Sequence, residues 1–506
     1  STEYRLAKFT HKTHFFYPIT PSATPRRLRI VSYETVIGME VHVELHTQSK
    51  MFCRCPADHF QVEANAHVCP VCTAQPGALP VINERAMQLT AMTGMALHCT
   101  VQPHNVFARK NYVYPDLPKG YQVSQYELPL CTDGYVDVAT KEGVKRIGVV
   151  RVHLEEDTGK LQHEGRSSLV DYNRAGVPLM EIVTDSSIRS AEEAYAYLTK
   201  IRQVVRYLGA STGDMEKGAM RCEANISIRP QGATEYGTKV EVKNLNSFRA
   251  VRNAIEYEVK RQEQVIEEGG QVRQVTMGWD ENAGATREQR SKETSEDYRY
   301  FPEPDLLDIR LSDEWIDAAR GELPELPEVK AARFINEYGL GEQDVAVLIE
   351  DQHIASYYEE AARGDGADHK QVANWVTGEV FRRLNKDDGD SQDIKVPASA
   401  LAELILLVER GTINQNAARE VFNEIWENGG TPAELVEAKG LAQISDSGEL
   451  DGAVAQVIAD NPDASEKIRE GNLKTIGFLM GQVMKATRGK ANPQLVQELI
   501  KKQLGV

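Results

Sequence analysis

Apolar and polar residues alternate with a period of two in several stretches before residue 310. The alternation is clearest in 36-VIGMEVHVEL-45, 147-IGVVRVHL-154 and 238-TKVEVKNL-245. Such a pattern puts apolar side chains on one face of a β-strand and polar side chains on the other. A helical pattern over 190–209 lies between two of these stretches, with Ser190 as a typical N-cap and Gly209 as a typical end. The pattern therefore predicts a mixed sheet that buries one face under helices.

From about residue 325 onward the hydrophobic period becomes that of helices. The change follows the proline-rich segment 323-LPELPEVK-330, and a later acidic stretch, 385-NKDDGDSQD-393, is typical of a loop. We therefore expect an α+β chain with three folded parts: a mixed α/β domain over 31–324, a helical domain over 325–394 and a small helical tail over 395–506. Residues 1–30 have one acid against six Lys or Arg and are expected to form an N-terminal extension, either a mobile arm or a transit segment.

The overall charge of the chain limits the kinds of partner it can have. The 506 residues carry a formal net charge of −17, which argues against nonspecific binding of polyanions over the whole surface. No apolar run reaches the roughly 18 residues of a membrane span, so we expect no membrane function. The segment 471–506 reverses the charge balance with six Lys or Arg and one acid. It is either a phosphate-contacting face or an ordinary solvated helix surface.

Four of the seven cysteines fall in two close pairs separated by thirteen residues. The pairs are Cys53 with Cys55 and Cys69 with Cys72. Two such pairs can close a tetrahedron around Zn²⁺, and four thiolates leave no open position for chemistry. We therefore expect a structural zinc site; the alternative is a cysteine cluster without metal. The remaining cysteines lack partner spacing and are expected in the core: Cys99, Cys131 and Cys222.

Carboxylates recur on the polar side of the first predicted strand. Glu40, His42 and Glu44 are two residues apart and share one face. Two carboxylates and an imidazole suit a hard cation such as Mg²⁺, which prefers oxygen ligands. The alternative is an ordinary solvated face.

Two later strands repeat this theme. One ends in three consecutive acids, Glu155, Glu156 and Asp157. Acids this close repel one another unless a cation or a base neutralises them. In the strand over 238–245, the residues that share a face are Lys239, Glu241 and Lys243. That carboxylate between two ammonium groups is either part of an ion-pair ladder or a metal ligand beside phosphate-binding lysines.

The run 170-VDYNRAGVPLMEIVT-184 combines charged residues with an apolar, strand-like segment. Asp171, Asn173 and Arg174 precede a Gly-x-Pro bend, and Glu181 lies within the apolar part. An unpaired buried charge is costly, so these charges need a reason to be there. Either the run holds a charged ligand, or Arg174 and Glu181 form a structural pair.

Several well-known chemistries have no signature in this chain. It contains no Gly-x-x-x-x-Gly-Lys-Ser/Thr loop, so any nucleotide site is not of the P-loop kind. It also lacks the Gly-Gly-Ser-Ser run of an amidase and a Cys–His arrangement of the glutaminase kind. We therefore expect that this chain does not release ammonia itself.

Long motifs in a fixed order resemble one known family. They are VIGMEVHVEL, the CRC and VCPVC cysteine motifs, FARKNYVYPDLPKGYQVSQ, HLEEDTGK, DYNRAGVPLMEIVT, MRCEANIS, KVEVKNLNSF and DYRYFPEPDL. The chain resembles the B subunit of the tRNA-dependent amidotransferases, the GatB/GatE family, which works in the Asp/Glu-tRNA(Asn/Gln) amidotransferase GatCAB. The resemblance runs from about residue 31 to the end, where MGQVMKATRGKANPQLV is similar to the family's YqeY-like tail. The chain is too short for the large inserted domain of the archaeal GatE branch.

This resemblance implies a fold and an activity. The first domain would be a cradle-shaped catalytic domain, followed by the helical domain and the YqeY-like tail. The cradle would bind the acceptor end of a misacylated tRNA together with ATP and Mg²⁺. ATP would phosphorylate the Glu or Asp side chain carried by that tRNA, and ammonia from the amidase subunit would displace the phosphate. A small third subunit would complete the heterotrimer, located in the cytoplasm or, alternatively, in a mitochondrial or plastid matrix.

The resemblance also implies which residues form the site. The catalytic positions would be Glu40, His42, Glu155, Glu156 and Glu241. Mg²⁺ would be held by Glu40, His42, Glu156 and Glu241, and Zn²⁺ by Cys53, Cys55, Cys69 and Cys72. The substrate and channel positions would be Lys110 and Tyr112 at the mouth of the ammonia route, with Asn173, Arg174 and Lys243. We further expect Arg174 to pair with an acid.

Two functions compete for this chain. The first is an enzyme subunit that phosphorylates and amidates aminoacyl-tRNA. The second is a catalytically silent tRNA-binding and assembly subunit, in which the acids form structural ion pairs. A zinc-ribbon nucleic-acid binder fits poorly with the acidic net charge. The sequence leaves open whether Glu-tRNA(Gln), Asp-tRNA(Asn) or both would be the substrate.

Overall fold

The computed structural model describes residues 32–506, apart from 292–297, 365, 388, 444–446 and 488–489. The N-terminal extension expected over residues 1–30 lies outside the described residues. Among the helices that are described, none is long and apolar enough to cross a membrane.

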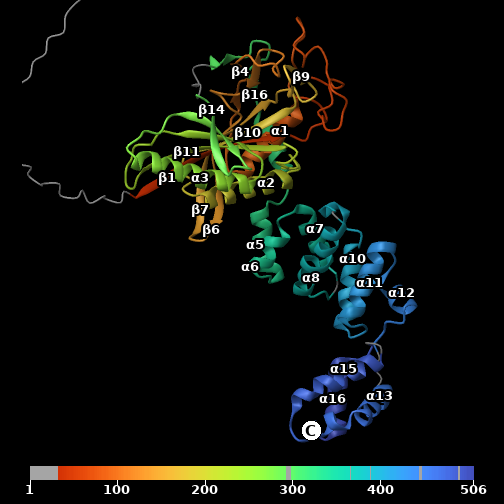
Figure 1. The fold of residues 1–506 in the computed structure, drawn as a ribbon. Helices are drawn as coiled ribbons and strands as arrows, with labels where there is room; N and C mark the ends of the chain where they lie inside the picture. Colours follow the sequence, from red (N-terminus) through yellow and green to blue (C-terminus); the bar gives the residue numbers. More distant parts are fainter. Residues whose placement is uncertain (1–31, 292–297, 365, 388, 444–446, 488–489) are drawn as a thin grey trace, which may run out of the picture.

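A nine-stranded sheet forms the centre of the first domain, in the order β14-β13-β12-β11-β1-β10-β7-β6-β2 (Figure 1). Its strands are β1 (Tyr33–Glu44), β2 (Thr100–Val101), β6 (Cys131–Thr140), β7 (Gly143–Glu156), β10 (Pro178–Thr184), β11 (Met220–Pro230), β12 (Val240–Leu245), β13 (Val275–Asp280) and β14 (Ala285–Ser291). Neighbouring strands run antiparallel, except that β12 and β13 pair in parallel. A parallel pair needs a crossover connection, and α3 (Phe248–Glu267) supplies it.

Smaller sheets of two or three strands lie beside this sheet. They are β15 (Phe301–Pro302), β4 (Ala108–Asn111) and β5 (Tyr121–Ser124) in one sheet, β3 (His104–Asn105) with β16 (Ile309–Arg310), and the hairpin of β8 (Lys160–Glu164) with β9 (Ser167–Asp171). Because β5 also packs against β7, the three-stranded sheet brings β4 close to the centre of the large sheet.

Helices cover the apolar face of the large sheet. They include α2 (Ala191–Tyr207) and α3, which lie on one side of it in Figure 1, and α1 (Glu84–Ala96), whose buried side chains belong to the same core. The alternating residues Met39, Val41 and Val43 of β1 are fully buried in the same core as side chains of these helices. The Ser190 hydroxyl accepts a hydrogen bond from the backbone N–H of Glu193, as the predicted N-cap requires. The opposite, polar face of β1 is therefore free to carry a site.

The described residues after β16 are mainly helical. The sheet domain also contains α1 (Glu84–Ala96) and α4 (Asp313–Gly321). The helices that follow are α5 (Pro327–Tyr338), α6 (Glu342–Leu348), α7 (Gln352–Ala362), α8 (His369–Trp375), η2 (Val376–Val380), α9 (Phe381–Asp387), η3 (Ser391–Asp393), α10 (Ala398–Glu409), α11 (Gln415–Asn428), α12 (Pro432–Ala438), α13 (Ser447–Asp460), α14 (Pro462–Arg469), η4 (Leu473–Thr475), α15 (Ile476–Ala486) and α16 (Pro493–Leu504). The expected α+β class, a mixed sheet with helices followed by a helical region, is confirmed.

The described residues of the helical part form two hydrophobic cores. One extends from Phe334 to Val436, and the other from Leu450 to Leu504. The division that we expect at residue 394 falls inside the first of them, because Leu401 and Leu404 of α10 pack with α7 rather than with the tail. In the described residues the first of these cores ends at Val436 and the second begins at Leu450, while the boundary at residue 394 stays a prediction.

Candidate active site

Polar side chains from five adjacent strands meet on the face of the large sheet that α2 and α3 leave uncovered. Because β1 lies inside the sheet, its outward residues have neighbours on both sides. Glu40 pairs in register with Glu223 of β11, and His42 pairs with Glu181 of β10. Side chains directly opposite each other on neighbouring strands lie close together. The strand pairing therefore concentrates acids that are far apart in the sequence.

The first cluster consists of His42, Glu155 and Glu181. One ligand atom from each lies within 4.8 Å of the others. The His42 Nε2 atom is 3.4 Å from Glu155 Oε1 and 3.7 Å from Glu181 Oε2, and His153 Nε2 is 3.2 Å from that same Glu181 oxygen. Burial disfavours the charged form of His42, but the Glu181 and Glu155 carboxylates outweigh burial and raise the pKa of the imidazole. This cluster can hold a cation with one nitrogen and two oxygens.

The second cluster consists of Glu40, Glu223 and Glu241, again with one oxygen from each within 4.8 Å of the others. Lys243 Nζ donates a hydrogen bond of 2.7 Å to Glu223 Oε1, and the Thr276 hydroxyl donates one of 2.7 Å to Glu241 Oε2. Burial and repulsion from Glu181 and Glu223 raise the pKa of Glu40. Oxygen ligands that repel one another in this way favour a hard divalent cation.

The structure separates Glu156 from both clusters. Consecutive residues of a strand point to opposite faces, so Glu155 faces His42 while Glu156 faces the other way. Lys119 Nζ donates to Glu156 at 2.5 Å, and the backbone N–H of Val123 donates to Glu156 Oε1 at 2.9 Å. The set Glu40, His42, Glu156 and Glu241, which the resemblance implies for Mg²⁺, is therefore not brought together. Glu155, not Glu156, lies beside His42 in the first cluster. Glu241 lies beside Glu40 in the second cluster.

Lys110 and Tyr112 lie at the edge of the first cluster, on and just after β4. Lys110 Nζ is 5.0 Å from the centre of the Tyr298 ring and 5.8 Å from that of Tyr112. Burial would lower the pKa of Lys110, but nearby negative groups, led by Glu155, raise it. The ammonium group therefore stays charged beside the carboxylates.

Asn173 and Arg174 hold neighbouring loops in place. The Asn173 side chain accepts from the backbone N–H of His67 at 2.8 Å and donates to the carbonyl of Glu63 at 2.7 Å. Arg174 donates to the carbonyls of Thr158 and Gly159. Its acidic neighbour is Asp157, at 3.6 Å, as expected for an arginine paired with an acid. The alternative pair of Arg174 with Glu181 is wrong, because Glu181 turns toward the histidines.

The four cysteines of the two predicted pairs converge. The sulfur atoms of Cys53, Cys55, Cys69 and Cys72 all lie within 4.8 Å of one another. A hydrogen bond from Cys53, assisted by Cys69 and the charge of Lys50, lowers the pKa of the Cys72 thiol to about 4 although burial opposes it. Four sulfur donors grouped around one point fit Zn²⁺ and leave no vacant ligand position. The remaining cysteines are buried elsewhere: Cys99, Cys131 and Cys222.

Sequence patterns alone do not single out Glu223 and His153 as members of the site. Both stand at outward positions of alternating strands, in MRCEANIS and RVHLEE. The signal that finds them is the same period of two that selects Glu40 and His42. It becomes specific only when β11 and β7 are known to lie near β1.

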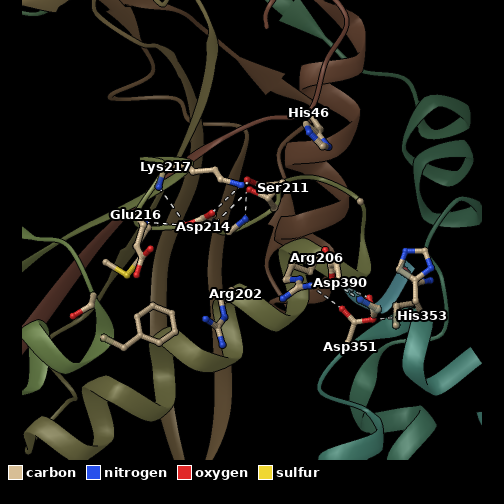
Figure 2. A pocket seen from close by; sticks show the side chains of 18 of the residues that line it. His46, Arg202, Arg206, Ser211, Asp214, Glu216, Lys217, Asp351, His353 and Asp390 are labelled. Atoms are coloured by element: carbon tan, nitrogen blue, oxygen red, sulfur yellow. Dashed lines mark hydrogen bonds and ion pairs between the residues drawn. The ribbon is translucent and has the colours of Figure 1, made fainter. Parts of the chain in front are cut away.

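A cavity of about 700 Å³ lies between the sheet domain and the helical domain, away from the sheet face that carries the two carboxylate clusters (Figure 2). Figure 2 shows Arg206 of α2 facing Asp351, which caps α7; their side chains are 2.8 Å apart. Lys217 lies near Asp214 in the same cavity. No residue of the two carboxylate clusters lines it, and some of its acids and bases pair with one another, Arg206 with Asp351 and Lys217 with Asp214. The cavity is therefore a junction between domains and is separate from the two carboxylate clusters.

Known proteins match this chain over most of its length. Residues 35–317 match the family model of the GatB/GatE catalytic domain, and residues 356–504 match that of the GatB domain with the YqeY-like region. The B subunit of the aspartyl/glutamyl-tRNA(Asn/Gln) amidotransferase from Thermodesulfovibrio yellowstonii is 50% identical over 475 residues, which is 94% of this chain and 100% of the relative. The proteins of the same name from Trichlorobacter lovleyi and Roseiflexus sp. are each 50% identical, over 473 and 486 residues, with 93% and 94% of this chain and 99% of each relative covered.

Proposed function

Because this chain belongs to the GatB/GatE family, we propose that it acts as the B subunit of an aspartyl/glutamyl-tRNA(Asn/Gln) amidotransferase. In that role it is a carbon–nitrogen ligase that uses ATP. It assembles with the amidase subunit that releases ammonia and with a small third subunit, and it acts on misacylated tRNA. The named relatives are bacterial, which supports the cytoplasm as its location.

The observation that carries this proposal is the pair of carboxylate clusters on one sheet face. His42, Glu155 and Glu181 would hold one Mg²⁺, and Glu40, Glu223 and Glu241 would hold a second. When bound, Mg²⁺ neutralises phosphate charge, which a reaction between a carboxylate and ATP requires. Glu156 has no part in this arrangement, because its carboxylate bonds Lys119.

The reaction has two steps, each balanced in bonds and charge. A side-chain carboxylate oxygen of the aminoacyl group attacks the γ-phosphorus of ATP; an O–P bond forms, the bond to the β-phosphate breaks, and ADP leaves. Ammonia then attacks the activated carbonyl carbon; a C–N bond forms, phosphate leaves with its electron pair, and the nitrogen loses a proton. Lys110 and Lys243 place fixed positive charge beside the two clusters, where it balances acids that would otherwise repel the substrate. Lys110 and Tyr112 are also placed to line the mouth of an ammonia route.

The four-cysteine cluster would hold Zn²⁺ in a purely structural role. Asn173 ties the loop between the two cysteine pairs to the run that leads into β10. A metal at the cysteines would therefore stabilise the strand that carries Glu181. In this proposal Asn173 and Arg174 support the site by holding its neighbouring loops in place.

The proposed function can be tested by reconstitution. The chain is combined with the amidase and the small third subunit, then supplied with Glu-tRNA(Gln) or Asp-tRNA(Asn), glutamine, ATP and Mg²⁺. We expect Gln-tRNA or Asn-tRNA to form only when ATP and this chain are both present. Product without this chain, or without ATP, would exclude the proposal.

The helical tail offers a second test, of the tRNA partner. Residues 447–506 have their own core, and their last part, 471–506, carries six Lys or Arg against one acid. Deleting them is expected to weaken tRNA binding by about tenfold or more, because several phosphate contacts are lost. Product formed at saturating tRNA should change little. Filter binding at two salt concentrations measures this, with Lys502→Glu as a smaller change in the same direction. Unchanged affinity of the deletion would remove the tail from the tRNA contact.

A further inference from the structure

One buried lysine in the cysteine region has no place in the proposed chemistry. Lys50 lies just after β1, three residues before Cys53, and only 1% of it is exposed. Burying an ammonium group without a partner is costly. Lys50 Nζ is 3.7 Å from Cys72 Sγ and 3.1 Å from the carbonyl oxygen of Tyr172. The lysine therefore joins the cysteine cluster to the run 171–177.

The backbone at Gly176 passes within van der Waals reach of Lys50 and Cys72. Gly176 has φ +85°, a conformation that side chains rarely adopt, and a Cβ there would lie 3.7 Å from Lys50 Cδ and 3.6 Å from Cys72 Cβ. The carbonyl of Gly176 accepts from the backbone N–H of Met51 at 2.7 Å. The run that leads to β10 thus passes directly over the lysine and the cysteine.

The positive charge of Lys50 can offset the negative charge of a metal bound by the four cysteines. Four thiolates around a divalent cation carry a net charge of −2, and such a charge in a poorly hydrated place needs a positive neighbour. Groups that hydrogen-bond to metal ligands raise metal retention, and their loss typically costs 10- to 100-fold in affinity. Lys50 is in contact with a ligand sulfur and shielded from water.

We propose that Lys50 is the charge partner of the four-cysteine metal centre and couples that centre to the run 171–177, which continues into the strand that carries Glu181. The proposal rests on the zinc site proposed above. Lys50 is a positioning residue: it contacts neither the carboxylate clusters nor any reacting atom. Its ammonium group contacts the Cys72 sulfur on one side and the Tyr172 carbonyl on the other. These two contacts fix the position of the run 171–177 relative to the metal centre.

The test measures zinc release from the full chain. Wild type, Lys50→Met and Lys50→Gln are purified, their zinc content is determined, and release to a coloured chelator is followed over time. Both variants are expected to start with bound zinc and to release it about 10- to 100-fold faster than wild type. Arg54→Met is the matched control, because it removes an exposed positive charge between Cys53 and Cys55. Its release rate should equal that of wild type.

The outcomes separate the two proposals. Wild type without zinc would exclude the zinc site itself. Wild type with zinc, together with an unchanged release rate in Lys50→Gln, would exclude the role of Lys50 and leave the zinc site standing. Faster release in Arg54→Met to the same degree would show a general charge effect and also count against Lys50. A Lys50→Gln chain that fails to fold would contradict the proposal as well, since it requires a folded chain that holds metal weakly.

Discussion

Amidated tRNA formed by the reconstituted complex is expected to fall by about 100-fold or more in Glu155→Gln, the range typical of groups that stabilise reacting charge. Glu155 is 2% exposed and lies 3.4 Å from His42, so its carboxylate belongs to the first cluster. Glutamine keeps the shape of the side chain and removes its charge. The substitution therefore weakens cation binding without opening a cavity. The measurement is the rate of product formation at saturating tRNA and ATP, with tRNA affinity as the quantity expected to stay unchanged.

The neighbouring variant Glu156→Gln is the matched control. It removes the same charge one residue away, on the opposite side of β7, where the carboxylate bonds Lys119. Leaving a buried partner without its charge typically costs about 1–3 kcal/mol of stability. We expect a lower melting temperature in Glu156→Gln and a rate close to that of wild type. A large loss of rate in Glu156→Gln with little loss in Glu155→Gln would place the chemistry on the other face and restore the set of ligands that the resemblance implies. Normal rates in both variants would favour the silent tRNA-binding role.

The choice between Glu155 and Glu156 shows what the sequence can predict here. Alternation in 147–154 predicts a strand, and continuing its period of two from His153 places Glu155 on the polar face and Glu156 on the other. The sequence does not show that this polar face lies beside that of β1; the strand order β1-β10-β7 and the pairing of Glu155 with Leu179 supply that. That register depends on β10, which follows in sequence and is positioned by long-range packing.

Other features were predictable to the extent that their cause is local. The cysteine cluster is predictable because two short spacings bring four sulfurs into reach of one another. Glu40 and His42 share a face for an equally local reason. By contrast, Glu223 joins Glu40 only through the strand order, which no local pattern fixes. The division at residue 394 stays a prediction; it rests on an acidic loop, and helices on both sides of that loop share one core.

Loss of a single cysteine of the cluster is expected to have the second large effect. In Cys69→Ser the zinc content should fall from near one per chain to nearly none. Structural zinc sites contribute on the order of 10 kcal/mol to folding, so the surrounding loops should open when the metal is lost. The loop between the cysteine pairs is bonded to Asp171 and Asn173 through Asn65 and His67. The disturbance should therefore reach residues 170–177 and, beyond them, the strand that carries Glu181.

Metal analysis and hydrogen exchange check this expectation on the same samples. Backbone amides in 57–72 and 170–177 should lose protection in Cys69→Ser, while α2 and α3, which pack on the other face of the sheet, should keep theirs. Cys222→Ala is the control, because Cys222 is buried in the main core and is not one of the four grouped cysteines. That variant should be somewhat less stable but retain its zinc and its protection in both segments. Full protection of 170–177 in a zinc-free Cys69→Ser chain would separate the cysteine cluster from the site. It would mean that the carboxylate face is held in place by the sheet alone.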